Sequence, residues 1–155
     1  MSSPLGGYIG PRPDWSPWRQ SGVFDISDRF AGIERALKTV TVAAGATVLD
    51  SISMADPCLI RSVRLSRAGW IRFYDSDAAR FQDAARLVSS DPISAAGIHL
   101  EVRTSGDQTV STAPAVYITN RQLQAGQPYP IRLTNESPLP DIEVEVTFIP
   151  LLATV

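Results

Sequence analysis

The sequence contains few of the residues on which enzymes and disulfide-bonded proteins depend. Its 155 residues include one cysteine and one histidine. A single cysteine excludes an internal disulfide. A single histidine means that serine-histidine-aspartate chemistry or a histidine-based metal site would have to use His99. The sequence shows no motif for catalysis, metal, nucleotide or nucleic-acid binding. We therefore expect a protein that is not an enzyme and that binds no cofactor or metal.

The sequence also lacks a surplus of positive charge and a long apolar run. It has 14 lysines and arginines against 16 aspartates and glutamates, a formal net charge of -2. Without a basic field, neither nucleic acid nor an anionic membrane is expected as a partner. No run is long enough to cross a bilayer, and residues 1–20 lack the basic and apolar parts of a secretion signal. We expect a soluble protein that is made in the cytosol.

Residues 1–30 differ in composition from the rest of the chain. Proline and glycine recur through them and oppose a regular helix or a central strand. The segment nevertheless carries aromatic and apolar side chains, which flexible polar linkers omit. We predict an extended N-terminal arm whose side chains dock either on the same domain or on a neighbouring molecule. The predicted contact residues are Tyr8, Ile9, Trp15, Trp18, Val23 and Phe24.

Residues 31–155 are predicted to form one domain, an antiparallel, jelly-roll-like β-sandwich with one short helix. Apolar and polar residues alternate in most of its segments, as in strands with one buried face. Prolines 114, 128 and 130 predict that parts of these strands lie at sheet edges. The predicted strands are 38–42, 47–52, 59–65, 70–74, 98–103, 109–111, 116–119, 129–135 and 142–148.

The central stretch 58–88 gives the most detailed expectations. Leu59, Val63 and Leu65 share one parity and are predicted to face the core. Gly69, with a positive φ, is predicted to return the chain as an antiparallel hairpin in which Arg72 points to solvent.

Two helices are considered. Ser76 is a suitable N-cap for a short helix across a sheet edge, whose core-facing residues would be Phe81, Ala84, Ala85 and Val88. Residues 25–37 are ambiguous, because their apolar spacing suits a short helix capped by Ser27 while Gly32 weakens it.

Several polar residues are candidates for chemistry, and each has a simpler structural interpretation. Cys58 is interpreted as a buried, inert thiol and His99 as a surface residue. Glu143 and Glu145 lie two apart on one strand face, and a solvated sheet explains them better than glycoside hydrolysis. The triplet 135–137 matches the N-glycosylation pattern and is interpreted as a loop. Four aspartates lack the order of a calcium loop and suit caps and turns; they are Asp75, Asp77, Asp83 and Asp91.

Arginine is concentrated in the same central stretch, interleaved with aspartate, which favours ion pairing over nucleic-acid binding. Arg64 and Arg72 are predicted to lie on one sandwich face that contacts a partner. Stacking of Trp15, Trp18 or Trp70 on sugars is the alternative, as in a host-glycan-binding module. The arginines are Arg61, Arg64, Arg67, Arg72, Arg80 and Arg86.

Two stretches resemble virion proteins of tailed phages. Gly6 to Phe30 resembles an opening in which a glycine-rich piece precedes Ser-Gly-Val-aromatic, here Ser21 to Phe24, and then a polar run. Ile71 to Pro92 resembles a strand–helix–loop of small β-sandwich virion proteins of cyanophages and related phages, with Asp-Ala-Ala-Arg at Asp83 to Arg86.

This resemblance implies a non-enzymatic component of the virion. One expected role is a capsid cement or decoration protein whose arm holds adjacent major capsid subunits together. A tail or fibre subunit is the nearest alternative. Small sandwiches of this kind imply a homotrimer.

Overall fold

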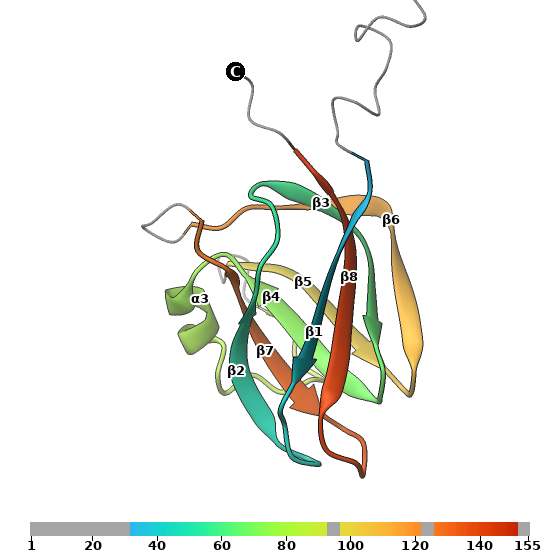
Figure 1. Ribbon diagram of the computed structural model, residues 1–155. Coiled ribbons are helices and arrows are strands. Elements are labelled where there is room, and N and C mark those ends of the chain that lie inside the picture. Colours follow the sequence, from blue (N-terminus) through green and yellow to red (C-terminus); the bar gives the residue numbers. More distant parts are fainter. Residues whose placement is uncertain (1–31, 93–96, 122–125, 152–155) are drawn as a thin grey trace, which may run out of the picture.

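The computed structural model describes residues 32–92, 97–121 and 126–151, which form two stacked four-stranded sheets and one short helix (Figure 1). The predicted all-β sandwich is confirmed. The predicted arm, residues 1–30, lies outside the described residues. The elements are β1 (Glu34–Val40), β2 (Thr47–Ile52), β3 (Cys58–Leu65), β4 (Gly69–Tyr74), α3 (Asp77–Gln82), β5 (Ile98–Thr104), β6 (Gln108–Ile118), β7 (Tyr129–Asn135) and β8 (Ile142–Pro150).

The strand order is that of a jelly roll. One sheet, here called sheet A, has the order β1-β8-β3-β6, and sheet B has the order β2-β7-β4-β5. The first strand pairs with the last, the second with the seventh, the third with the sixth and the fourth with the fifth. This nested pairing corresponds to one long antiparallel hairpin rolled into two sheets. Because β1 and β8 are neighbours, residues 32 and 151 lie at the same end of the sandwich (Figure 1).

The predicted hairpin between residues 59–65 and 70–74 is wrong. Both strands form, but β3 pairs with β6 and β8, whereas β4 pairs with β5 and β7 in the other sheet. Alternation identifies strands with a buried face without identifying their partners, and here the two buried faces meet across the core. Gly69 is also not needed for a positive φ. A Cβ at this position would lie 3.0 Å from the Thr134 carbonyl oxygen, so glycine permits close packing.

A β-bulge changes which side chains of β3 face the core. The pairing of β3 with both neighbours shifts between Ile60 and Ser62. Cys58 and Ile60 are buried before the shift, and Val63 and Leu65 are buried after it. Leu59, predicted to face inward, therefore lies on the outer face, because one extra residue reverses the alternation.

The helical alternative for residues 25–37 is wrong in its described part. Glu34–Val40 is strand β1, paired along its length with β8. Leu37 is 63% exposed instead of lying on a helical core face. Residues 25–31 lie outside the described residues.

The predicted start of the helix after β4 is confirmed, but the helix ends before three of the four residues of its predicted core-facing side. The Ser76 Oγ accepts a hydrogen bond from the Ala79 N–H at 3.1 Å, as an N-cap does. The helix ends at Gln82, and Phe81 is 79% exposed. Ala79 is buried, and the helix contacts β4 and β7. The predicted face based on Phe81 is therefore wrong.

The prediction that prolines mark sheet edges is correct for Pro114 and wrong for Pro130. The predicted strands 109–111 and 116–119 are parts of β6, which is an edge strand as Pro114 suggests. Strand 129–135 is confirmed as β7, but β7 lies between β2 and β4, so Pro130 does not mark an edge. Pairing of β7 with β4 stops at Ile131, which leaves Pro130 with a paired strand on one side only.

Candidate interaction surfaces

The outer face of sheet B is covered by the chain that follows β4. Arg72 is predicted from the sequence to point to solvent, and that prediction is wrong, because the residue is 2% exposed. Its guanidinium lies 3.5 Å from the centre of the Trp70 ring, and its Nη2 donates to the Thr134 Oγ1 at 2.7 Å. Burial lowers the pKa of Arg72 to about 10. The Nε of Arg72 and that of Arg132, its neighbour on β7, are buried with no hydrogen-bond partner among the described residues.

Asp83 holds this covering chain against the sheet. Its carboxylate is 6% exposed and accepts hydrogen bonds from the Tyr74 hydroxyl at 2.5 Å and the Arg86 Nε at 2.6 Å. Arg86 also donates to Glu101 at 2.9 Å, and Glu101 accepts from the Trp70 Nε1 at 3.1 Å. Burial would raise the pKa of Asp83, but the hydrogen bonds from Arg86 and Tyr74 outweigh it and the pKa is lowered. This arrangement closes the outer face of sheet B around Trp70.

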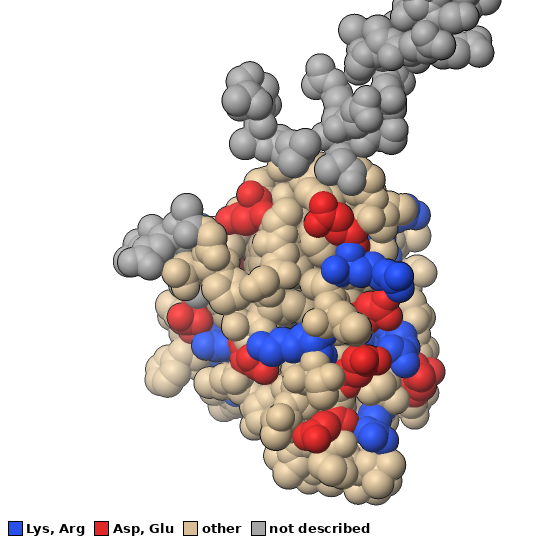
Figure 2. All heavy atoms as spheres, viewed as in Figure 1, with Lys and Arg blue, Asp and Glu red and all other residues tan. Residues whose placement is uncertain are grey.

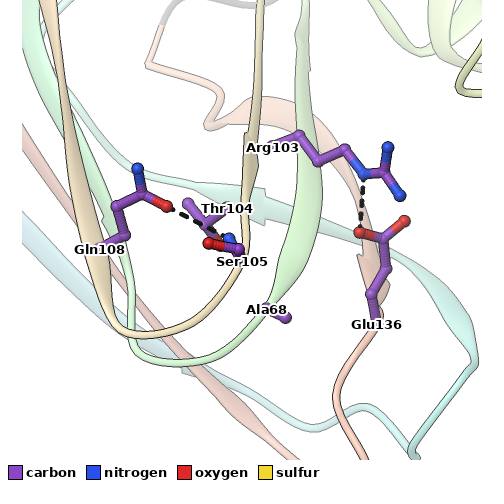
Figure 3. Close-up of a pocket in the computed structure, with 6 residues that line it drawn as sticks. All are labelled: Ala68, Arg103, Thr104, Ser105, Gln108 and Glu136. Atoms are coloured by element: carbon purple, nitrogen blue, oxygen red, sulfur yellow. Dashed lines mark hydrogen bonds and ion pairs between the residues drawn. The ribbon is translucent and has the colours of Figure 1, made fainter.

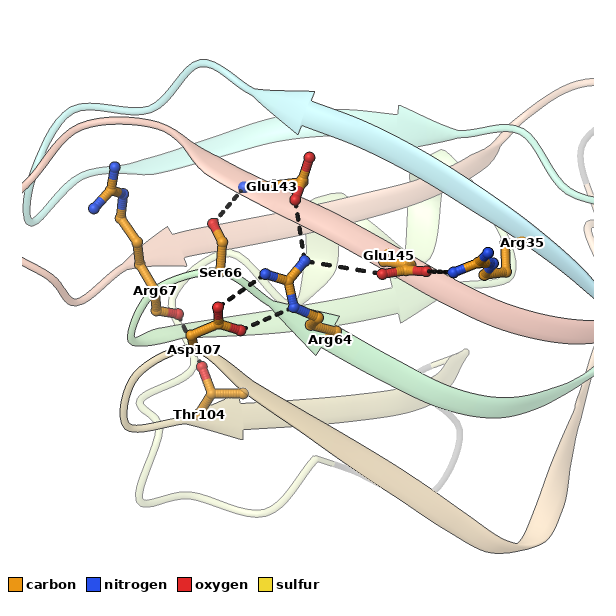
Figure 4. Close-up of polar contacts among 8 residues, drawn as sticks. All are labelled: Arg35, Arg64, Ser66, Arg67, Thr104, Asp107, Glu143 and Glu145. Atoms are coloured by element: carbon orange, nitrogen blue, oxygen red, sulfur yellow. Dashed lines mark hydrogen bonds and ion pairs between the residues drawn. The ribbon is translucent and has the colours of Figure 1, made fainter.

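Arg64 is the centre of an ion-pair network on the outer face of sheet A (Figure 4). Its Nε and Nη2 donate to the two carboxylate oxygens of Asp107 at 2.8 and 2.9 Å, and its Nη1 donates to Glu143 at 3.0 Å. Glu145 lies 3.8 Å from the Arg64 Nη1 and pairs with Arg35 at 2.7 Å. The acceptors hold the pKa of Arg64 well above its usual range. Glu143 and Glu145 thus join strands β1, β3 and β8.

Arg64 and Arg72 do not share a face, because β3 belongs to sheet A and β4 to sheet B. The predicted common contact face is therefore wrong. Contact of Arg64 with a partner stays a prediction, and it would require exchange of an existing ion pair. On the face shown in Figure 2, positive and negative side chains are interleaved. This agrees with the ion pairing expected from the sequence.

An open hollow lies at the end of the sandwich with the short turns (Figure 3). It encloses about 540 Å³. Across it, the Arg103 Nε donates to Glu136 at 2.9 Å, and the Gln108 side chain accepts from the Ser105 N–H at 3.2 Å. Arg103, Glu136, Ser105 and Gln108 thus form hydrogen bonds within the lining of this hollow. Its lining is Ala68, Arg103, Thr104, Ser105, Gln108 and Glu136.

The remaining chemical candidates have structural roles. Cys58 is fully buried, and burial raises the pKa of its thiol to about 11. The His99 Nε2 contacts the Thr119 carbonyl oxygen, so His99 is partly covered instead of standing free on the surface. The Asn135 side chain is buried and donates to the carbonyl oxygens of Val42 and Leu139, which makes it part of a turn.

Within residues 32–92, 97–121 and 126–151, no group of three or more His, Cys, Asp or Glu side chains is placed to hold a metal ion. In the same part of the chain, none of the helices has the length and apolar character needed to cross a membrane.

Comparison with known proteins gives no family assignment. No protein-family model matches this sequence, and no curated protein matches it significantly. The jelly-roll fold, the surface contacts and the composition of residues 1–30 are therefore the grounds for a functional proposal.

The structure also shows an apolar surface that the sequence pattern does not predict. Leu59 pairs with Ile149 on one side and with Tyr117 on the other. All three side chains alternate with buried or partly buried neighbours and therefore lie on the outer face of sheet A. Tyr117 is 56% exposed, and Ile33, next to the first pair of β1 with β8, is 55% exposed. We call Ile33, Leu59, Tyr117 and Ile149 the apolar row. The apolar row could not be predicted from the sequence, because simple alternation without the bulge in β3 assigns Leu59 to the core.

The predicted arm contacts Tyr8, Ile9, Trp15, Trp18, Val23 and Phe24 lie outside the described residues, and their role stays a prediction.

Proposed function

We propose that the protein is a structural subunit of a tailed-phage virion, a capsid decoration protein that binds adjacent major capsid subunits through its N-terminal arm. One observation carries the proposal: a jelly-roll sandwich whose first strand begins directly after an aromatic-rich segment, at the end where the chain also finishes. A domain joined to its arm at one end can be tethered there while its other end stays free. The resemblance of residues 6–30 and 71–92 to phage virion proteins supports the same role.

The predicted arm carries six aromatic and aliphatic side chains that could add apolar contact area to the largely ion-paired domain surface. Each aromatic side chain that becomes buried on a neighbouring subunit contributes roughly 1.5–3 kcal/mol. Ordering of the segment opposes this with about 1–2 kcal/mol for each backbone residue fixed. A few well-buried anchors, above all Trp15 and Trp18, would then dominate attachment. We expect a homotrimer, because closed symmetric assembly covers sheet edges that a single sandwich leaves open.

Removal of residues 1–30 separates attachment from folding. The shortened protein should stay soluble and unfold cooperatively near the native melting temperature. It should also fail to incorporate into particles, which then resist heat less well. The double variant Trp15→Ala/Trp18→Ala should reproduce most of this loss, whereas Arg12→Ala/Arg19→Ala in the same segment serves as the control. Occupancy is measured by cryo-electron microscopy of purified particles. Loss of the fold on deletion, or undiminished occupancy of the tryptophan variant, contradicts the proposal.

Two other roles make different predictions in the same experiments. Density of this subunit at the tail instead of the capsid would assign it to the tail or fibre. A glycan-binding role through Trp70 is disfavoured because Trp70 is 6% exposed and its ring is covered by Arg72. Binding on a glycan array that disappears in Trp15→Ala/Trp18→Ala would favour a glycan-binding arm, and a silent array would exclude it.

A further inference from the structure

The apolar row lies where the undescribed N-terminal residues join the sandwich. Strand β1 begins at Glu34, opposite Phe148, and the row partner Ile149 is the next residue of β8. The chain outside the structure thus ends beside the row. At the junction Gly32 has a φ of +76°, a left-handed conformation that glycine adopts without strain and that changes the chain direction. The preceding residues are therefore close enough to cover the row.

Beyond the apolar row the outer face of sheet A is mainly polar; Leu37, 63% exposed on β1, is separated from Ile33 by Arg35 and stands outside the row. The next pairs along β3 are Ser62 with Thr147 and Arg64 with Glu145. Arg61, at the bulge between the apolar row and these polar pairs, is exposed and makes no ion pair within the described residues. The surface thus offers a strip of apolar side chains with Arg61, which has no ion pair among the described residues, at its side.

The sequence immediately before Gly32 matches this strip. In Asp25-Ile26-Ser27-Asp28-Arg29-Phe30, residues 26, 28 and 30 share one parity, so an extended backbone would place them on one side. Ile26 and Phe30 are four residues apart, roughly 13 Å in an extended chain. The apolar row crosses the four strands of sheet A, a width of roughly 14 Å for three strand spacings. Asp28, between the two apolar side chains, is the complement of Arg61.

We propose that residues 25–31 lie across the apolar row of their own sandwich, with Ile26 and Phe30 on the row and Asp28 at Arg61. Docking within the same chain is favoured because only one residue separates Ala31 from Ile33, which keeps the segment at the row at high effective concentration. The residues from Tyr8 to Phe24 are not used by this contact. Docking of residues 25–31 therefore does not depend on the proposed attachment to a particle.

Hydrogen–deuterium exchange on the full-length protein tests the docking. Amides of residues 25–31 should exchange at least about tenfold more slowly than in an unstructured peptide, corresponding to about 1.4 kcal/mol. The protection should be the same at low and high protein concentration. Tyr117→Ser and Arg61→Glu should each remove most of it. Leu49→Ser is the matched control, since Leu49 is 55% exposed but lies on sheet B, and it should leave the protection unchanged.

Three results would overturn the proposal. Unprotected amides in the native protein would show that the row has no occupant from this chain. Protection that rises with protein concentration would assign the occupant to a second copy. Protection that survives both Tyr117→Ser and Arg61→Glu would place the segment elsewhere. Removal of residues 1–30 also deletes Ile26, Asp28 and Phe30, so the variant that separates the two proposals is Trp15→Ala/Trp18→Ala. This variant should lose particle attachment and keep the exchange pattern of residues 25–31, whereas Tyr117→Ser should lose the protection and keep particle attachment.

Discussion

Replacement of Asp83 by alanine tests how the chain after β4 is held on the outer face of sheet B. Asp83 is 6% exposed, and the side chain of its partner Arg86 is 9% exposed. Removal of one member of a buried ion pair costs about 3–5 kcal/mol, because the remaining charge is left without compensation. Arg86 keeps Glu101 at 2.9 Å, so the lower part of that range applies. We expect a loss of about 3 kcal/mol in the free energy of unfolding.

This loss is large enough to be measured by thermal and by chemical unfolding. For a domain of this size, 1 kcal/mol shifts the melting temperature by about 4 °C, so Asp83→Ala should melt about 12 °C below the native protein. The matched control is Asp77→Ala. The Asp77 side chain is 66% exposed and pairs with Arg80 in the same helix, and an exposed pair contributes at most about 1 kcal/mol. Equal melting temperatures for the two variants would refute the role given to Asp83.

The same residue predicts a dependence on pH. Because hydrogen bonds from Arg86 and Tyr74 lower the folded-state pKa of Asp83, the carboxylate stabilises the fold above its unfolded pKa of about 3.9. That contribution is lost as the pH falls through the folded-state value. The stability advantage of the native protein over Asp83→Asn should therefore be constant near neutral pH and shrink below about pH 4. Urea unfolding at a series of pH values measures it, and an advantage that does not change in acid would contradict the explanation.

Two further predictions concern the core and the turn between the sheets. The pKa of the Cys58 thiol is raised to about 11 by burial, so Ellman's reagent at about pH 8 should not label the native protein and should label it fully in guanidinium. Rapid labelling of the folded protein would show that the thiol is accessible. Gly69→Ala should cost about 1–3 kcal/mol, because the new Cβ would meet the Thr134 carbonyl oxygen at 3.0 Å. Gly106→Ala, with nothing within 4 Å of the added carbon, should be close to neutral, and equal melting temperatures would argue against the packing explanation.

The positions of most strands could be predicted from the sequence, because alternation depends on neighbouring residues alone. Strand β7 occupies the predicted residues 129–135, and β8 extends the predicted 142–148 by two residues to Pro150. The partners of β3 and β4 could not be predicted. Two consecutive strands, each with one buried face, can pair in the same sheet or pack against each other from opposite sheets, and both arrangements bury the same side chains. Such choices are made by contacts between residues far apart in the chain.

The surfaces were harder to predict than the fold. Arg72 has the parity of an outward residue, as predicted, but the chain after β4 covers that side of the sheet and buries it. Leu59 lies outside because a single bulge residue reverses the alternation of β3. Neither the covering chain nor the bulge leaves a local signal in residue type. The contact residues expected in residues 1–30 stay predictions.

The nested strand pairing gives the sandwich two unequal ends. At one end β1 begins and β8 ends, and there the chain also leaves β2, β4 and β6 and enters β3, β5 and β7. At the other end the turns 66–68 and 105–107 are short, and Gly106 has open space around its Cα. If the predicted arm holds the protein to a larger body through the residues from Tyr8 to Phe24, the short-turn end faces the surroundings. A peptide or label inserted at Gly106 would then be displayed outward without passing near the chain termini, so the domain offers a natural mounting point for foreign sequences.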